Sequence, residues 1–329
     1  MLKTPVLLIT FNRPDHTGKV LSAIIEAHPQ DLYVFQDGAR EGNGKDGIKC
    51  AEVRDVIDNL IKGTEIRLHT FYANGNLGCG AGPATAISWF FENVEMGIVI
   101  EDDCLPNQDF FSYCEVLLER YKYDDKVRFI NSTLYNDRWK CGDSYGFSHY
   151  MVTGAWAGWR RTWQGYDLNL KHIDAKAFRK HVFKLTGNRA EANWWFSIVK
   201  EIQQDERKKS YWDYQMQINL FCNSALTIHP KVNLVSNIGF DGEGTHTVSE
   251  SDQRGNRKFF PILPLIHPLS VEVDKNLDSL CWAKAQSHGF IKDNIGYLYQ
   301  KLLWSDGLGH RLLMLYKRVK GKGVNTCKI

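Results

Sequence analysis

Three consecutive carboxylates, Glu101, Asp102 and Asp103, directly follow an apolar run at residues 97–100. Neighbouring carboxylates repel one another, so a site that gathers three of them needs a cation or a protonated member. Oxygen donors that leave coordination positions open for phosphate suit a hard divalent ion, and we expect Mg²⁺ or Mn²⁺ here. A solvated acidic turn before the helix expected from Asn107 onward is the alternative for the same residues.

A fourth carboxylate, Asp213, precedes an apolar stretch at helical spacing, residues 216–221. Aspartate is a favoured residue at the start of a helix, where its side chain accepts hydrogen bonds from backbone N–H groups. A carboxylate in a cleft can also act as a general base that takes a proton from a hydroxyl group. The residue pattern leaves both roles open.

Further polar side chains follow the other expected strands. Arg13 follows the strand expected at 5–11, and Asp37 follows the strand expected at 32–35. Asn76 lies in the turn after a third expected strand. In a parallel sheet the carboxyl ends of the strands meet at one edge, where ligands bind. We therefore expect these side chains near the carboxylate cluster, although Asp37 also suits an ordinary turn and Arg13 a plain surface position.

The elements that must position these residues alternate between strand and helix in the first part of the chain. Helical spacing at 16–27, 53–61 and 84–93 separates the expected strands. This alternation predicts an α/β fold with a mainly parallel central sheet flanked by helices. The later part is less regular, with strands expected near 127–130, 147–152, 226–228 and 233–236, and helices near 175–184, 193–203 and 214–222. We expect a single composite domain, divided at 1–125 and 126–250, with a C-terminal extension at 251–329.

Composition excludes several classes of protein. The chain has 329 residues, of which 43% are hydrophobic, and its formal net charge is +3. It is thus too apolar to be disordered and too weakly charged to wrap nucleic acid. Eight cysteines without any CxxC pair predict reduced thiols in a cytoplasmic protein. The apolar run at 6–11 is too short for a signal peptide, and no apolar stretch is long enough to cross a bilayer.

Taken in order, four segments resemble those of the GT-A glycosyltransferases, and within them the inverting N-acetylglucosaminyltransferase I-like enzymes and their bacterial relatives. The segments read PVLLITFNR (5–13), FQDG (35–38), VIEDD (99–103) and YWDYQM (211–216). Between the last two, residues 154–159 resemble the acceptor-side loop and helix start of that family. Tyr214 stands where the family often has a second acidic residue, so we expect an altered acceptor side.

The resemblance implies a metal-dependent inverting glycosyltransferase. Its donor would be a nucleotide diphosphate sugar, for which we expect a UDP-sugar, bound by the half at 1–125. It would transfer a hexosyl or N-acetylhexosaminyl group to a hydroxyl of a saccharide or lipid-linked saccharide, bound by the half at 126–250. We expect such a reaction in the assembly of bacterial surface glycans or lipid-linked oligosaccharides.

The resemblance also implies roles for particular residues. Asp213 would be the catalytic base. The implied metal ligands are Asp103, Glu101 and His246, of which His246 lies in a Gly-rich loop and could equally be an ordinary exposed histidine. The implied donor-binding residues are Arg13, Asp37, Asn76 and Asp102. The implied acceptor-binding residues are Trp212 and Trp156.

The C-terminal segment is basic, with no Asp or Glu after Asp306. Its lysines and arginines alternate with leucines and aromatic residues, a pattern that suits peripheral binding to the inner face of a cell membrane. A solvated basic tail is the alternative. For the whole protein, the alternatives are a nucleotidyltransferase that makes sugar nucleotides and a non-catalytic carbohydrate-binding protein. Nucleotidyltransferases usually carry a Gly-rich basic loop after the first strand, whereas this chain has Asn12-Arg13-Pro14-Asp15.

Overall fold

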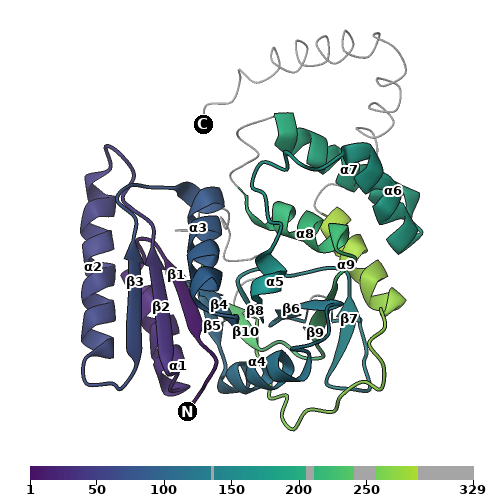
Figure 1. The fold of residues 1–329 in the computed structure, drawn as a ribbon. Helices are drawn as coiled ribbons and strands as arrows, with labels where there is room; N and C mark the ends of the chain where they lie inside the picture. The colour runs from purple at the N-terminus through teal and green to yellow at the C-terminus, as the bar shows by residue number, and fades with distance from the viewer. Residues whose placement is uncertain (135–136, 205–210, 241–256, 288–329) are drawn as a thin grey trace, which may run out of the picture.

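The computed structural model describes residues 1–134, 137–204, 211–240 and 257–287. Within them lies an eight-stranded sheet with the order β3-β2-β1-β4-β8-β6-β9-β7, flanked by helices (Figure 1). The α/β fold predicted from the sequence is confirmed. Because β4 from the first half pairs with β8 from the second, both halves share one sheet. His246 and the segment after Asp306 lie outside the described residues, and the boundaries at 125/126 and 250/251 stay predictions.

The first half is the parallel part of the sheet. Its strands are β1 (Val6–Thr10), β2 (Asp31–Gln36), β3 (Arg67–Tyr72) and β4 (Met96–Glu101). Leu8 of β1 lies opposite Val34 of β2 and Ile100 of β4. All five residues of β1 are buried, as expected for a central parallel strand that is covered by helices on both faces.

Three helices connect these strands: α1 (Pro14–Glu26), α2 (Gly44–Ile61) and α3 (Gly78–Asn93). Apolar residues of α1 and α2 pack on the face of the sheet that carries Leu8. Residues of α3, among them Phe90, pack on the opposite face against Leu7. Successive side chains of β1 point to opposite faces of the sheet, so this strand contributes to the hydrophobic cores on both faces.

The second half is mixed in direction. Its strands in the main sheet are β6 (Val127–Asn131), β7 (Tyr145–Ser148), β8 (Ala155–Trp159) and β9 (Leu226–Pro230). Strand β8 runs antiparallel to both β4 and β6, whereas β6 and β9 are parallel. A separate two-stranded ribbon joins β5 (Cys104–Pro106) to β10 (Val235–Asn237). The helices are α4 (Gln108–Arg120), α5 (Arg160–Trp163), α6 (Ala175–Thr186), α7 (Arg189–Gln204), α8 (Asp213–Cys222) and α9 (Lys275–Ser287).

Residues 154–159 differ from the loop and helix start that the resemblance implied. Residues 155–159 form strand β8 inside the sheet, followed by the single turn α5. Alternation along β8 turns Trp156 toward the face covered by α3 and α8, and turns Ala155 and Ala157 toward the other face. Trp156 is fully buried and stacks on Phe129, with ring centroids 4.6 Å apart and planes 15° apart. The prediction that it forms a wall of the acceptor pocket is therefore wrong for this structure, since packing covers its whole surface.

None of the helices in the described ranges is both long and apolar enough to span a membrane.

Candidate functional site

The candidate site lies where the strand order reverses. Strand β1 is flanked by β2 on one side and β4 on the other, because the chain runs outward from β1 to β2 and β3 and then crosses back past β1 to form β4. In open α/β sheets, ligands bind in the crevice beyond the carboxyl ends of the two strands at such a switch point. Arg13 follows β1, Glu101 ends β4, and Asp102 and Asp103 follow it, so both groups predicted from the sequence lie at the carboxyl ends of these two strands.

Arg13 faces the carboxylates directly. Its Nη1 atom lies 3.3 Å from Oδ2 of Asp103 and 4.0 Å from Oδ1 of Asp102, and all three side chains are mostly buried. The backbone fastens the same segments together. The amide of Phe11 donates to Oδ2 of Asp102 at 3.3 Å, and the amide of Asp102 donates to the carbonyl oxygen of Ile9 at 3.0 Å. Asp102 therefore ties the end of β4 to the loop that carries Arg13.

Two of the carboxyl groups, Glu101 and Asp102, have raised pKa values. Burial, and then the charges of Asp103, Asp102 and Asp213, raise the pKa of Glu101 well above its ordinary value, while Arg13 opposes the rise. Burial, followed by the charge of Asp103, raises the pKa of Asp102 to about 7. One guanidinium thus balances this acidic edge only in part, and a further positive charge would stabilise it.

The carboxylates at this edge are oxygen ligands of the kind that hard divalent cations prefer. Asp103 offers carboxylate oxygens next to Gly239, where a Cβ atom would lie 2.5 Å from Oδ2 of Asp103. The backbone can approach this carboxylate closely because residue 239 has no side chain. Within the described ranges, no group of three or more His, Cys, Asp or Glu side chains is arranged so that it could hold a metal ion. Mg²⁺ is commonly bound through one or two carboxylates plus substrate phosphates, which is the kind of partial site that Asp103 and Glu101 can offer.

Asp37 and Asn76 lie at the neighbouring strand end, and both are engaged with the loop that precedes α3. Oδ1 of Asp37 accepts hydrogen bonds from the amides of Gly38 and Leu77, at 2.9 and 2.8 Å. Oδ2 accepts from Nδ2 of Asn76 and from the amide of Gly78, both at 3.0 Å. Burial raises the pKa of Asp37, and the three backbone donors oppose that rise. Contact of these two residues with a donor stays a prediction; the role visible here is to hold the N-terminal corner of α3.

Asp213 is the first residue of α8, and its Oδ1 atom accepts a hydrogen bond from the amide of Tyr214 at 2.9 Å. It stands near the carboxylate edge, since its charge contributes to the raised pKa of Glu101. Of the two positions that the sequence left open, the structure shows the helix start: Asp213 directly follows Trp212, the N-cap residue of α8. Its role as a base stays a prediction.

Trp212, the residue before Asp213, is 6% exposed and packs near Trp156 and Trp163, with ring centroids 6.4 and 6.2 Å away. Its ring supports the start of α8 from the core side. At that exposure it offers little surface to an acceptor, so packing is the role that the structure shows.

Two contributors to this edge were not singled out from the sequence. Gly239 approaches the Asp103 carboxylate, and the amide of Ile238 donates to the Asp103 carbonyl oxygen at 2.8 Å. Cys104 Sγ lies 3.3 Å from Oδ1 of Asp103. The glycine could have been suspected from its place in a Gly-rich stretch after an expected strand, whereas no sequence signal marks Cys104.

No family model matches the chain, and no curated protein matches it either. Among solved structures, HddC from Yersinia pseudotuberculosis matches 50% of this chain and 80% of its own, with 11% identity and a TM-score of 0.31. The same protein in complex with GMP-PN matches equal shares, with 12% identity and a TM-score of 0.30. The 4-diphosphocytidyl-2C-methyl-D-erythritol synthase from Anaerococcus prevotii DSM 20548 matches 50% of this chain and 75% of its own, with 8% identity and a TM-score of 0.30. These values are too low to add anything to the α/β topology described above, and the resemblance to GT-A glycosyltransferases stays a prediction.

Proposed function

We propose that this protein is a metal-dependent inverting glycosyltransferase that uses a nucleotide diphosphate sugar. The observation that carries the proposal is that Arg13, after β1, faces Asp102 and Asp103, after β4, where the strand order reverses. A crevice of this kind suits a nucleotide, and its incompletely balanced acidic edge suits a divalent cation together with a diphosphate.

Each residue has a distinct task in this proposal. Asp103 and Glu101 would hold Mn²⁺ or Mg²⁺, which neutralises charge on the leaving diphosphate. Arg13 keeps the Asp103 carboxylate oriented and adds positive charge to the crevice. Asp213 accepts the proton of the acceptor hydroxyl. The hydroxyl oxygen then forms a bond to the anomeric carbon as the bond from that carbon to the diphosphate oxygen breaks, and a single displacement inverts the anomeric centre.

The donor class can be tested by thermal shift with UDP-, GDP-, CMP- and dTDP-sugars, each with and without Mn²⁺. We expect stabilisation by one nucleotide, with UDP as the expected base, and a requirement for the metal. The absence of any response would contradict the proposal.

The base can be tested with Asp213→Asn. This change keeps the shape of the side chain and removes its basicity, so we expect turnover of the donor to fall by about 100-fold or more while donor binding persists. Asp55→Asn, an exposed position on α2, is the matched control and should leave both unchanged. Retained turnover in Asp213→Asn would refute the assignment.

Nucleotidyl transfer is the second candidate, because a crevice with acidic metal ligands also suits a nucleoside triphosphate. Against it, the loop between β1 and α1 has only three residues, Phe11, Asn12 and Arg13, with a single cation and no glycine to wrap a triphosphate. Release of pyrophosphate from a nucleoside triphosphate and a sugar 1-phosphate would favour this second reaction. Binding of sugars without any turnover would instead indicate a carbohydrate-binding protein.

A further inference from the structure

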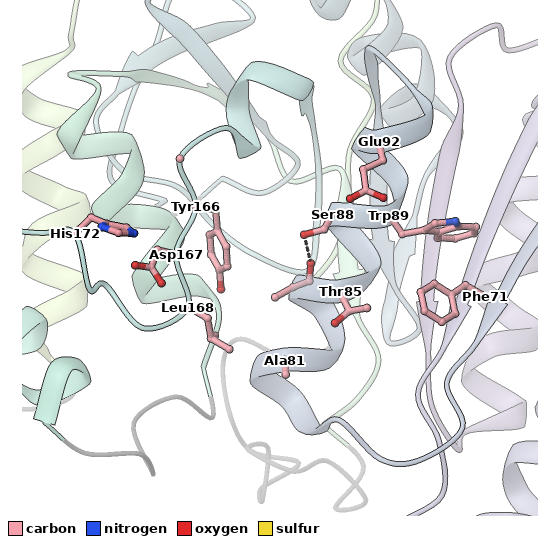
Figure 2. A pocket seen from close by; sticks show the side chains of 12 residues that line it. Phe71, Ala81, Thr85, Ser88, Trp89, Glu92, Tyr166, Asp167, Leu168 and His172 are labelled. Carbon is pink, nitrogen blue, oxygen red and sulfur yellow. Dashed lines mark hydrogen bonds between the residues drawn. The ribbon is translucent and has the colours of Figure 1, made fainter.

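A concave surface lies between α3 and the segment at 165–172 (Figure 2). It is an open groove of about 710 Å³. Thr85, Trp89 and Glu92 line it from α3, and Tyr166, Asp167 and Leu168 line it from the opposite side (Figure 2). Neither the sequence motifs nor the proposed catalytic residues account for this groove.

Both walls of the groove present aromatic rings that the core holds in place. Tyr166 stacks on Trp163, with ring centroids 3.9 Å apart and planes 14° apart. Trp89 packs edge-on against Phe71 and Tyr33, with centroids 5.7 and 5.2 Å away. Rings fixed in this way lose little conformational entropy when a ligand packs against them.

The charge of the groove disfavours one class of ligand. Among the described residues, its lining includes the carboxylates of Glu92 and Asp167 and the imidazole of His172, but no lysine or arginine. The two carboxylates disfavour a phosphate or another anion, whereas hydroxyl groups can donate hydrogen bonds to carboxylates. Aromatic faces next to carboxylate acceptors suit the alternating apolar and hydroxyl surfaces of a neutral sugar.

The wall formed by residues 165–172 is ordered by local hydrogen bonds. Oδ1 of Asp167 accepts from the amide of Asn169 at 2.8 Å, and Oδ2 accepts from the amide of Lys171 at 2.7 Å. These contacts fix the turn that presents Tyr166 and Leu168. The groove is thus formed before any ligand arrives.

Tyr166 links the groove to the start of α8 by a hydrogen bond. Its hydroxyl donates to the carbonyl oxygen of Trp212 at 3.3 Å, directly before Asp213. Burial, and then the charge of Asp213, raise the pKa of Tyr166, which is consistent with this proximity. A chain of sugar units that ends at Asp213 could therefore extend along α3.

We propose that this groove binds the remote, uncharged sugar units of a saccharide acceptor whose terminal hydroxyl reaches Asp213. This inference rests on the proposed glycosyltransferase function and adds the substrate class of the acceptor: a neutral oligosaccharide of several units.

The test uses the full-length protein and saturation-transfer-difference NMR with four neutral trisaccharides: maltotriose, cellotriose, chitotriose and mannotriose. We expect at least one of them to bind. Thr85→Trp, which fills the groove from α3, and Leu168→Trp, which fills it from the facing wall, should each weaken that binding by tenfold or more. Glu52→Trp, on the exposed face of α2, is the matched control and should bind as the wild type does.

Hydrolysis of the nucleotide sugar in the absence of an acceptor should stay unchanged in all three variants. If no trisaccharide binds, or if a folded Thr85→Trp and a folded Leu168→Trp bind as well as the wild type, the inference is overturned. A failed nucleotide-sugar panel combined with groove-dependent trisaccharide binding would instead overturn the proposed function and leave a saccharide site.

Discussion

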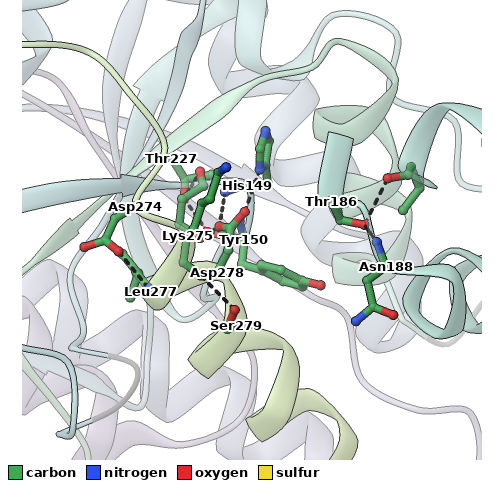
Figure 3. Close-up of polar contacts among 12 residues, drawn as sticks. His149, Tyr150, Thr186, Asn188, Thr227, Asp274, Lys275, Leu277, Asp278 and Ser279 are labelled. Carbon is green, nitrogen blue, oxygen red and sulfur yellow. Dashed lines mark hydrogen bonds and ion pairs between the residues drawn. The ribbon is translucent and has the colours of Figure 1, made fainter. Parts of the chain in front are cut away.

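Glu191 is a buried carboxyl group whose protonation should control stability near neutral pH. It is 4% exposed, and its Oε1 atom accepts a hydrogen bond of 2.5 Å from the hydroxyl of Tyr150. Figure 3 shows Tyr150 directed from the sheet toward the helical region of Thr186, beside His149 and Asp278. Burial raises the pKa of Glu191 from 4.5 to about 7; the charge of Asp278 adds to the rise, and the hydrogen bond from Tyr150 and the charge of His149 oppose it.

The sign of the effect follows from proton linkage. Because the pKa is higher in the folded state, the native protein keeps the Glu191 proton over a range in which the unfolded chain has lost it. Stability from this group is complete below pH 4.5, declines as the pH rises, and is lost above pH 7. The difference of 2.5 pKa units corresponds to about 3 kcal/mol at most.

Glu191→Gln replaces the carboxyl group by a neutral amide whose oxygen can still accept from Tyr150. Relative to the wild type, its free energy of unfolding should rise by about 2 kcal/mol between pH 5 and pH 8. Urea unfolding followed by tryptophan fluorescence at both pH values measures this difference, and any pH-independent effect of the substitution cancels. Glu52→Gln, at an exposed position on α2, is the control and should show no such rise. An equal difference between Glu191→Gln and wild type at both pH values would refute the reasoning.

Three further changes have calculable consequences. The side-chain hydrogen bond from Arg40 is the main cause that lowers the pKa of Asp46 from 3.8 to about 2. Arg40→Leu should therefore reduce the free energy of unfolding at pH 7 by up to about 1 kcal/mol. The urea unfolding midpoints of variant and wild type should converge as the pH falls from 4 toward 2. Asp37→Asn would place an NH₂ group opposite N–H donors that now face a carboxylate oxygen. It should lower the free energy of unfolding in urea by about 2 kcal/mol, and an unchanged unfolding midpoint would contradict this prediction. Gly154 has a φ of +105°, and a Cβ atom there would lie 2.6 Å from Sγ of Cys104. Gly154→Ala should therefore lower the free energy of unfolding by about 2 kcal/mol and lower the Tm. A melting curve that superimposes on that of the wild type would count against this prediction.

The parallel half of the fold was predictable because its strands are short, continuous apolar runs bounded by turn residues. The expected strand at 5–11 is observed as Val6–Thr10, and that at 97–100 as Met96–Glu101. Polar residues placed directly after such strands must lie at one edge of the sheet, which is why Arg13 and Asp103 were predicted to be neighbours. Sequence order and strand direction alone carry that information.

Strand β8 was missed because its composition carries no polar alternation. It lies between β4 and β6 with both faces covered, so small and aromatic residues fill it throughout. Trp156, Trp159 and Trp163 follow one another at spacings of three and four, which mimics a helical stripe. The orientation of Trp156 depends on pairing with strands distant in the sequence, and local spacing cannot report that.

The groove at Tyr166 could not be predicted from the sequence either, for a different reason. It depends on how the turn at 165–172 faces α3, and no local motif encodes the distance between two segments so far apart in the chain. Residues at strand ends can be grouped from topology, whereas surfaces between a helix and a loop require the tertiary structure.

The acidic edge is held by backbone hydrogen bonds that do not depend on the carboxylates themselves. The amide of Glu101 donates to the carbonyl oxygen of Gly154 at 2.8 Å, and the carbonyl oxygen of Asp103 accepts from the amide of Ile238 at 2.8 Å. Replacing the Asp103 carboxylate by an amide leaves these bonds intact, because none of them uses the side chain. It also relieves repulsion among neighbouring carboxylates that Arg13 balances in part, so the fold should tolerate the change. A loss of metal-dependent nucleotide binding in such a variant would therefore report on the chemistry of the carboxylate and not on a displaced strand end.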